Sequence, residues 1–229
     1  MRSWGWKIIC IILCMYVVVA GLLMPVPRLD ILNETIRNLY FHVPMWFTMI
    51  ALYGCAFFYS IKYLRTSDLR DDIYAVQFTN TGIAFNILGY VTGMEWAKFT
   101  WGAAWVPDAK LLGAAMSMLI YFAYSILRSG LKDEEKKAKI GAVYNVFAFA
   151  MMIPLIFVIP RMVDSLHPGN GGNPAFKQYD LDKYMRFVFY PAVIGWAMFG
   201  IWIATLKVRL ELVRYRRENA FQFELEKTK

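Results

Sequence analysis

Long apolar runs, separated by short segments rich in charged residues, Gly and Pro, dominate this 229-residue chain. A transmembrane helix needs about 20 apolar residues in succession. Six runs are of this length, and charged side chains occur in them only within a turn of an end. The alternation of a barrel strand is missing, and backbone groups in lipid must pair within their own segment. The pattern therefore predicts six transmembrane helices. They are expected over Trp6–Met24, Pro44–Tyr63, Ile73–Gly93, Leu111–Leu127, Ile140–Pro160 and Phe187–Leu206.

The composition supports an all-α polytopic membrane protein. Apolar residues make up 59% of the chain and charged residues 18%, against about 45–50% and about 25% in soluble domains. The connections are too short for a separate soluble domain, so residues 1–229 are expected to form one six-span membrane domain. The first run follows Arg2 and Lys7 as in a signal peptide, but it is longer than the about 7–15 residues of a signal core. We therefore expect a retained helix.

The distribution of basic residues predicts the orientation. Of the 25 Lys and Arg residues, 17 fall at the N-terminus, in the second and fourth connections and in the C-terminal tail. Because cytoplasmic segments carry the excess of Lys and Arg, both termini are expected in the cytoplasm. The first, third and fifth connections then lie outside. The net charge of +8 is thus mainly a topology signal and predicts no nucleic-acid partner.

The third connection, predicted as an external loop over residues 94–110, is rich in tryptophan. Trp96, Trp101 and Trp105 follow one another at spacings of five and four. On a surface helix or a re-entrant turn, these indoles can form one aromatic shelf for a large, flat, apolar ligand. An aromatic belt at the membrane interface is the simpler explanation, although a belt has no regular spacing.

Both histidines of the chain, His42 and His167, fall on this same predicted external side. Two neutral imidazoles beside an aromatic shelf suit an iron porphyrin, with one axial nitrogen on each face of the ring. His42 and His167 are therefore the candidate iron ligands of a bound heme b. Arg37, Lys98 and Lys110 are candidate cations for the heme propionates, although lipid phosphates are alternative partners.

At these residues the chain resembles a known family. Trp101, Gly102, Trp105 and Asp108 match the tryptophan-rich motif W-G-x-x-W-x-W-D of membrane proteins that handle heme for cytochrome c maturation, the CcmC/CcsA family. Pro107 replaces the last Trp of that motif, which predicts a narrower shelf.

The neighbouring residues extend the resemblance. His42 before Val-Pro, and His167 after the fifth run, resemble the two external heme-ligating histidines of the family. Lys110 replaces an Arg, which keeps the charge but removes a bidentate fork. Asp108 is expected to order its loop or a histidine.

The chain length and six runs resemble the CcmC type. The resemblance implies a protein without enzymatic activity that binds heme b at the external face and presents it to a periplasmic heme chaperone of the CcmE type. It also implies the two ABC transporter subunits of the CcmA and CcmB type, and a small single-span helper of the CcmD type. The expected location is the bacterial inner membrane, with the heme site on the periplasmic side of the lipid bilayer.

Two alternative functions remain open. A holocytochrome c synthase-type protein attaches heme to apocytochrome directly, but that branch of the family has longer chains and more spans. A membrane b-type cytochrome of electron transfer usually has its histidines inside the spans, whereas His42 and His167 lie at the ends of theirs.

Overall fold

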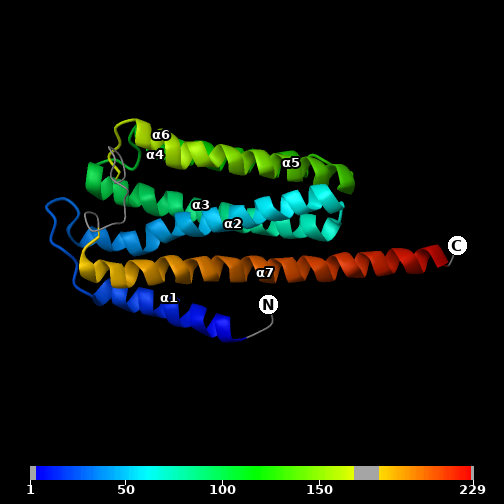
Figure 1. Cartoon of the computed structure of the whole chain (residues 1–229), viewed down its shortest axis with the longest axis horizontal. Helices are drawn as coiled ribbons and strands as arrows, with labels where there is room; N and C mark the ends of the chain where they lie inside the picture. Colours follow the sequence, from blue (N-terminus) through cyan, green and yellow to red (C-terminus); the bar gives the residue numbers. More distant parts are fainter. Residues whose placement is uncertain (1–3, 168–180, 228–229) are drawn as a thin grey trace.

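The computed structural model describes residues 4–167 and 181–227, and the regular structure within these ranges is helical (Figure 1). The elements are α1 (Gly5–Leu23), the 3₁₀ helix η1 (Asn33–Asn38), α2 (Leu39–Thr66), α3 (Leu69–Trp101), α4 (Ala109–Ser129), α5 (Glu134–Ile153), the π-helical turn η2 (Pro154–Val158), α6 (Ile159–Met162) and α7 (Lys183–Lys227). Because α5, η2 and α6 are continuous, the described residues form six long helical segments. The all-α fold predicted from the apolar runs is confirmed.

Five of these segments within the described residues are long and apolar enough to cross a membrane, and α3 is not among them. The middle of α3 carries polar side chains, and Thr79 and Asn86 are fully buried there. Helices α2, α4, α5 and α7 all contact α3. Thr79 exchanges hydrogen bonds with Asn145 of α5, whose Nδ2 also donates to Ser60 of α2 at 3.2 Å. The polar residues of α3 therefore face neighbouring helices, where hydrogen bonds compensate for burial.

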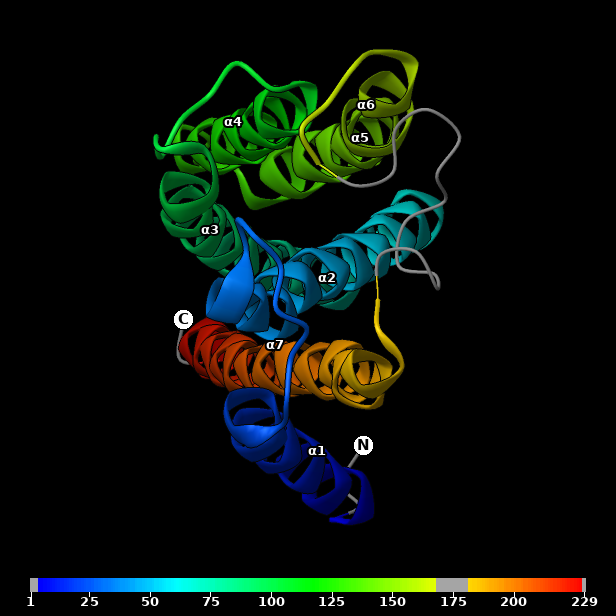
Figure 2. The same cartoon turned by 90° about the vertical axis from the view of Figure 1, so that its left-hand side faces the viewer.

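The helices stack in layers that Figure 2 shows end-on. Helix α7 lies between α1 on one side and the α2–α3 pair on the other, and α4 and α5 pack on the far side of that pair. Helix α1 contacts α7 through Leu13 and Cys14, which approach Gly195 closely. The α2–α3 pair is thus the centre of the bundle.

Helix α2 and helix α3 both extend further than the sequence predicted. Helix α2 starts at Leu39, more than one turn before Pro44, so that this proline lies inside the helix rather than at its start. Helix α3 continues to Trp101 and stops at Gly102, which has the left-handed φ of 79° typical of a helix C-terminus. The predicted external loop 94–110 is therefore helical as far as Trp101, as an extension of α3.

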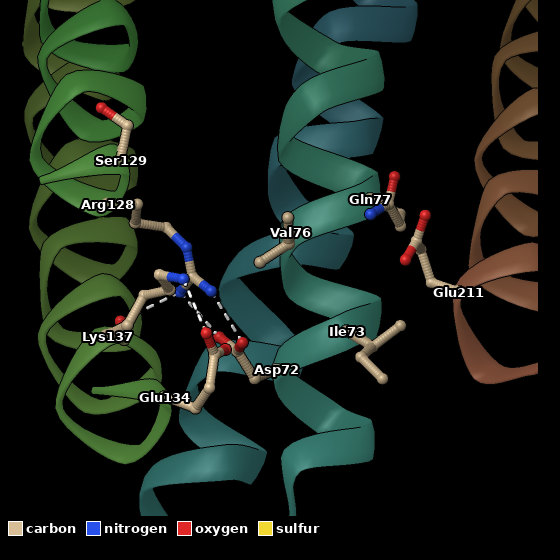
Figure 3. Close-up of a pocket in the computed structure, with 9 residues that line it drawn as sticks. All are labelled: Asp72, Ile73, Val76, Gln77, Arg128, Ser129, Glu134, Lys137 and Glu211. Carbon is tan, nitrogen blue, oxygen red and sulfur yellow. Dashed lines mark hydrogen bonds and ion pairs between the residues drawn. The ribbon is translucent and has the colours of Figure 1, made fainter. Parts of the chain in front are cut away.

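The bundle has two distinct ends. At one, which we call the histidine end, α1 and α3 finish and α2, α4 and α7 begin; it lies on the left of Figure 1. At the opposite end, Arg128 of α4 donates from Nη1 and Nη2 to the two carboxylate oxygens of Asp72 on α3, both at 2.8 Å (Figure 3). Arg128 Nη1 also donates to the carbonyl of Lys137 at the start of α5. This buried ion pair joins three helices beside a pocket of about 350 Å³.

Candidate functional site

His42 lies in the first turn of α2, against α3. Its Nδ1 is 3.2 Å from Oγ1 of Thr92, and that hydroxyl donates to the carbonyl of Leu88 at 2.8 Å. Thr92 Oγ1 therefore accepts from His42 Nδ1. On the other side of the ring, Nε1 of Trp46 donates to His42 Nε2 at 3.3 Å. Since an indole nitrogen can only donate, Nε2 carries the lone pair of this imidazole.

His167 is held by a buried carboxylate. Its Nδ1 lies 2.9 Å from Oδ1 of Asp108, whose side chain is only 2% exposed. The same carboxylate caps α4 by accepting from the N–H of Lys110, and its Oδ2 accepts from the N–H of Leu166 at 2.8 Å. Asp108 thus fixes both the start of α4 and the segment that follows α6. These are the contacts expected of a residue that orders its loop or a histidine.

The electrostatics of Asp108 and His167 favour an ionised carboxylate and a neutral imidazole. Burial raises the pKa of Asp108, but the N–H of Leu166, the hydroxyl of Ser165 and the charge of His167 outweigh it and hold the pKa below its usual value. Burial lowers the pKa of His167, against the opposing effect of Asp108. His167 is therefore a neutral imidazole at pH 7 that donates from Nδ1 and carries its lone pair on Nε2, the form that binds iron.

The two histidines come from distant parts of the chain to one end of the bundle. His42 lies in the first turn of α2, and His167 follows α6, so both lie at the histidine end of the bundle. In both rings Nδ1 is engaged by a protein acceptor, so Nε2 is the nitrogen that carries the lone pair. Two such nitrogens are the donor set that a six-coordinate heme iron requires.

The three predicted tryptophans lie against three different partners. The ring of Trp96 is edge-on to His42, with centroids 5.9 Å apart, and that of Trp101 is edge-on to His167, at 4.8 Å. Trp105 packs beside Tyr90 at 6.2 Å and is 45% exposed. A separation of five residues turns a helix by well over a quarter-circle, so Trp96 and Trp101 point in different directions. The predicted single shelf is replaced by one indole beside each histidine.

The predicted cations differ in what they contact. Arg37 donates from Nε to Glu34, and from Nη1 to the carbonyls of Gly21 and Met24 at the end of α1. Lys98 is exposed on the last turns of α3. Lys110 lies at the start of α4, near enough for its charge to act on His167. Arg37 therefore has a clear structural role, because it joins η1 to the end of α1.

Comparison with known proteins decides the family. The family described as heme exporter protein C (CcmC) matches residues 1–222. The chain belongs to the heme exporter protein C family. It is 22% identical over 182 residues to heme exporter protein C of Haemophilus influenzae, covering 80% of this chain and 73% of that protein.

Two further relatives agree with this membership. The heme exporter protein C of Escherichia coli K12 is 24% identical over 188 residues, covering 80% of this chain and 70% of that protein. The cytochrome c biogenesis protein CcsA of Cuscuta reflexa is 28% identical over 87 residues, 38% of this chain and 28% of that protein. Membership of the heme exporter protein C family places the chain in heme handling for cytochrome c maturation, as the tryptophan-rich motif predicted.

Sequence reasoning missed Trp46 and the glycines opposite it. A Cβ at Gly93 of α3 would lie 2.6 Å from Cε1 of His42, and one at Gly89 would lie 3.0 Å from Cε2 of Trp46. The two glycines are four residues apart, the small-xxx-small spacing that lets membrane helices approach closely. That spacing, and the position of Trp46 four residues after His42, are the signals that point to them. In this member of the heme exporter protein C family, Trp46, Gly89 and Gly93 surround the imidazole of His42.

Proposed function

We propose that this protein holds heme b between Nε2 of His42 and Nε2 of His167, and hands it to a periplasmic heme chaperone of the CcmE type. The contact between Asp108 and His167 carries the proposal. A buried carboxylate bonded to one nitrogen of a histidine orients the other nitrogen and increases its basicity, as it does for metal-bound histidines. A histidine that only closes a loop has no need of this arrangement.

The iron of the heme supplies two axial positions, and the protein supplies the groups that fill them. Trp96 and Trp101, each edge-on to a histidine, would contact the porphyrin ring. Trp105 extends the aromatic surface, and Lys98, Lys110 and Arg37 are the candidate partners of the propionates. Axial bonds are individually replaceable, so a ligand of the chaperone can take over one position at a time. Such a transfer needs no covalent step, and we propose no enzymatic activity.

The orientation and the partners complete the proposal. The excess of Lys and Arg at the end opposite the histidines supports a cytoplasmic location for that end and a periplasmic one for the heme site. The protein would then lie in the bacterial inner membrane. Its family supports an assembly with ABC transporter subunits of the CcmA and CcmB type and with a small single-span helper of the CcmD type.

The deciding experiment is an absorption spectrum with pyridine hemochrome on the detergent-purified protein after heme supplementation. We expect a b-type spectrum in the wild type, strongly weakened in both His42→Ala and His167→Ala. Phe99→Ala is the matched control, because Phe99 lies on the same end of α3 and is 64% exposed. A spectrum indifferent to both histidine substitutions would contradict the proposed ligands.

A second measurement separates heme transfer from heme attachment. The heme-loaded protein is mixed with a purified CcmE-type chaperone or with an apocytochrome c, and the acceptor is separated and tested for heme. We expect heme to move to the chaperone, and no acid-stable thioether-linked heme on the apocytochrome. Thioether formation with this chain alone would favour the synthase alternative.

A further inference from the structure

The two proposed heme ligands differ at the atom that would bind iron. Nε2 of His42 accepts the indole N–H of Trp46 at 3.3 Å. His167, by contrast, is held through Nδ1 by the charged Asp108 at 2.9 Å, which makes its Nε2 the more basic nitrogen. His42 Nδ1 instead lies 3.2 Å from a neutral acceptor, the hydroxyl of Thr92. This inference rests on the proposed function, since it concerns the strength of the two axial bonds.

The side chain of Trp46 is held in place by its neighbours on α2 and α3. It follows His42 by four residues, so both side chains lie on one face of α2. The two rings are edge-on, with centroids 6.1 Å apart and planes at 80°. Gly89 and Gly93 of α3 leave the space that the two rings occupy. The indole is therefore fixed with its N–H directed at His42.

Trp96 shows that this arrangement is particular to Trp46. The ring of Trp96 is also edge-on to His42, at 5.9 Å, but its N–H donates to Oγ1 of Thr35 at 3.4 Å. Two indoles thus contact the same imidazole, and only one of them donates to the lone pair of Nε2. A ring contact is compatible with iron at that nitrogen, whereas the hydrogen bond is not.

We infer that Trp46 is a positioning residue that holds Nε2 of His42 whenever heme is not bound there, so that His42 is the exchangeable axial ligand and His167 the lasting one. The nitrogen has one lone pair, which either accepts the indole N–H or binds iron. Forming the iron bond therefore breaks the hydrogen bond, and breaking the iron bond restores it, without transfer of a proton. When the ligand of the chaperone replaces His42 on the iron, the indole N–H of Trp46 donates again to Nε2 of His42. This hydrogen bond disfavours renewed binding of His42 to the iron.

The first test replaces the indole while keeping an aromatic ring. Hemin is titrated into detergent-purified Trp46→Phe, and the Soret band reports heme binding. Since a net hydrogen bond is worth about 0.5–1.5 kcal/mol, the substitution should tighten heme binding by about 2- to 10-fold. Cyanide, used as the competing iron ligand, should displace the axial histidine more slowly by a similar factor. The same substitution in a His42→Ala background should change neither quantity, because the lone pair is then gone.

Trp202→Phe is the matched control. Trp202 lies in α7 and packs edge-on against Trp6, away from the histidine end, and its buried indole N–H has no acceptor within the described part of the chain. This substitution should leave both the heme affinity and the rate of cyanide binding at the wild-type values.

The second test needs no change at Trp46 and covers the case in which Trp46→Phe does not fold. The heme dissociation constants of His42→Ala and His167→Ala are compared directly. Because carboxylate partners of ligand histidines contribute about 10- to 100-fold to affinity, the loss should be at least about 10-fold larger for His167→Ala.

The outcomes separate this inference from the proposed function. Three results would overturn the role of Trp46 and leave the heme site intact. They are an equal loss of heme affinity in the two histidine variants, weaker heme binding in Trp46→Phe, and an effect of Trp46→Phe that persists in the His42→Ala background. Heme binding that is indifferent to both histidines would instead overturn the proposed site.

Discussion

Asp108 Oδ1 lies 2.9 Å from Nδ1 of His167, and Oδ2 of the same carboxylate accepts the N–H of Leu166. One buried side chain therefore orients the imidazole and fixes the backbone that carries it. It also caps α4, so the position of His167 is tied to the start of a membrane-spanning helix. A histidine held in this way keeps its orientation whether or not a ligand is bound, which suits the proposed heme site.

Replacing Asp108 with Asn should weaken heme binding by about 10- to 100-fold, because the amide is a poorer acceptor for the imidazole N–H and carries no charge. Hemin titration followed at the Soret band measures the effect. Asp164→Asn is the control, since Asp164 is exposed in the same segment. An Asp108→Asn protein with wild-type affinity would show that the carboxylate serves only to cap α4.

Replacing Gly93 with Ala should displace the ring of His42, because the added methyl would lie 2.6 Å from Cε1. We expect a loss of b-type absorbance together with a destabilisation of about 1–3 kcal/mol from overpacking. Absorption spectra and thermal unfolding in detergent give the two quantities. Gly5→Ala is the control, since a Cβ there meets no atom within 4 Å; an effect equal to that control would contradict the close packing of α3 on His42.

Apolar length was enough to predict the helices, and the connections between them place His42 and His167 at one end of the bundle. The number and order of long helices follow from the cost of unpaired backbone in lipid, which leaves few alternatives. Helix α3 shows the limit of this signal. It is less apolar than the other long helices, although it packs against four neighbouring helices.

Contacts between distant residues could not be predicted from periodicity. Asp108 and His167 are 59 positions apart, and no local pattern pairs them. The segment around Trp96 is predicted as part of a connection because the apolar run before it ends at Gly93. Ala97, Lys98 and Phe99 permit a helix equally well, and the helix ends only at the left-handed Gly102. The length of α3 is therefore determined by its tertiary packing against α2.

Arg37→Lys separates two roles for this residue. In the structure, its guanidinium joins Glu34 to the carbonyls of Gly21 and Met24. A lysine keeps the positive charge but not the three-way fork, so we expect lower stability, by about 1.5–3 kcal/mol, with heme affinity retained. Thermal unfolding and hemin titration measure both. If stability were unchanged and heme affinity fell, Arg37 would act mainly on the propionates.

The Arg128–Asp72 pair at the opposite end should stabilise the bundle without affecting heme. Both side chains are nearly buried, at 12% and 11% exposure, so Arg128→Met leaves a buried carboxylate without its partner. We expect a destabilisation of about 3–5 kcal/mol, partly recovered in the double variant Arg128→Met/Asp72→Leu, in which no charge is left unpaired.

Glu134→Gln is the control, because Glu134 is 69% exposed in its pair with Lys137 and should contribute less than about 1 kcal/mol. The heme spectrum should be unchanged in all three variants, since the pair lies at the far end of the bundle from His42 and His167. A change in the spectrum of Arg128→Met at temperatures where the protein remains folded would instead show that the two ends are energetically linked through α3 and α4.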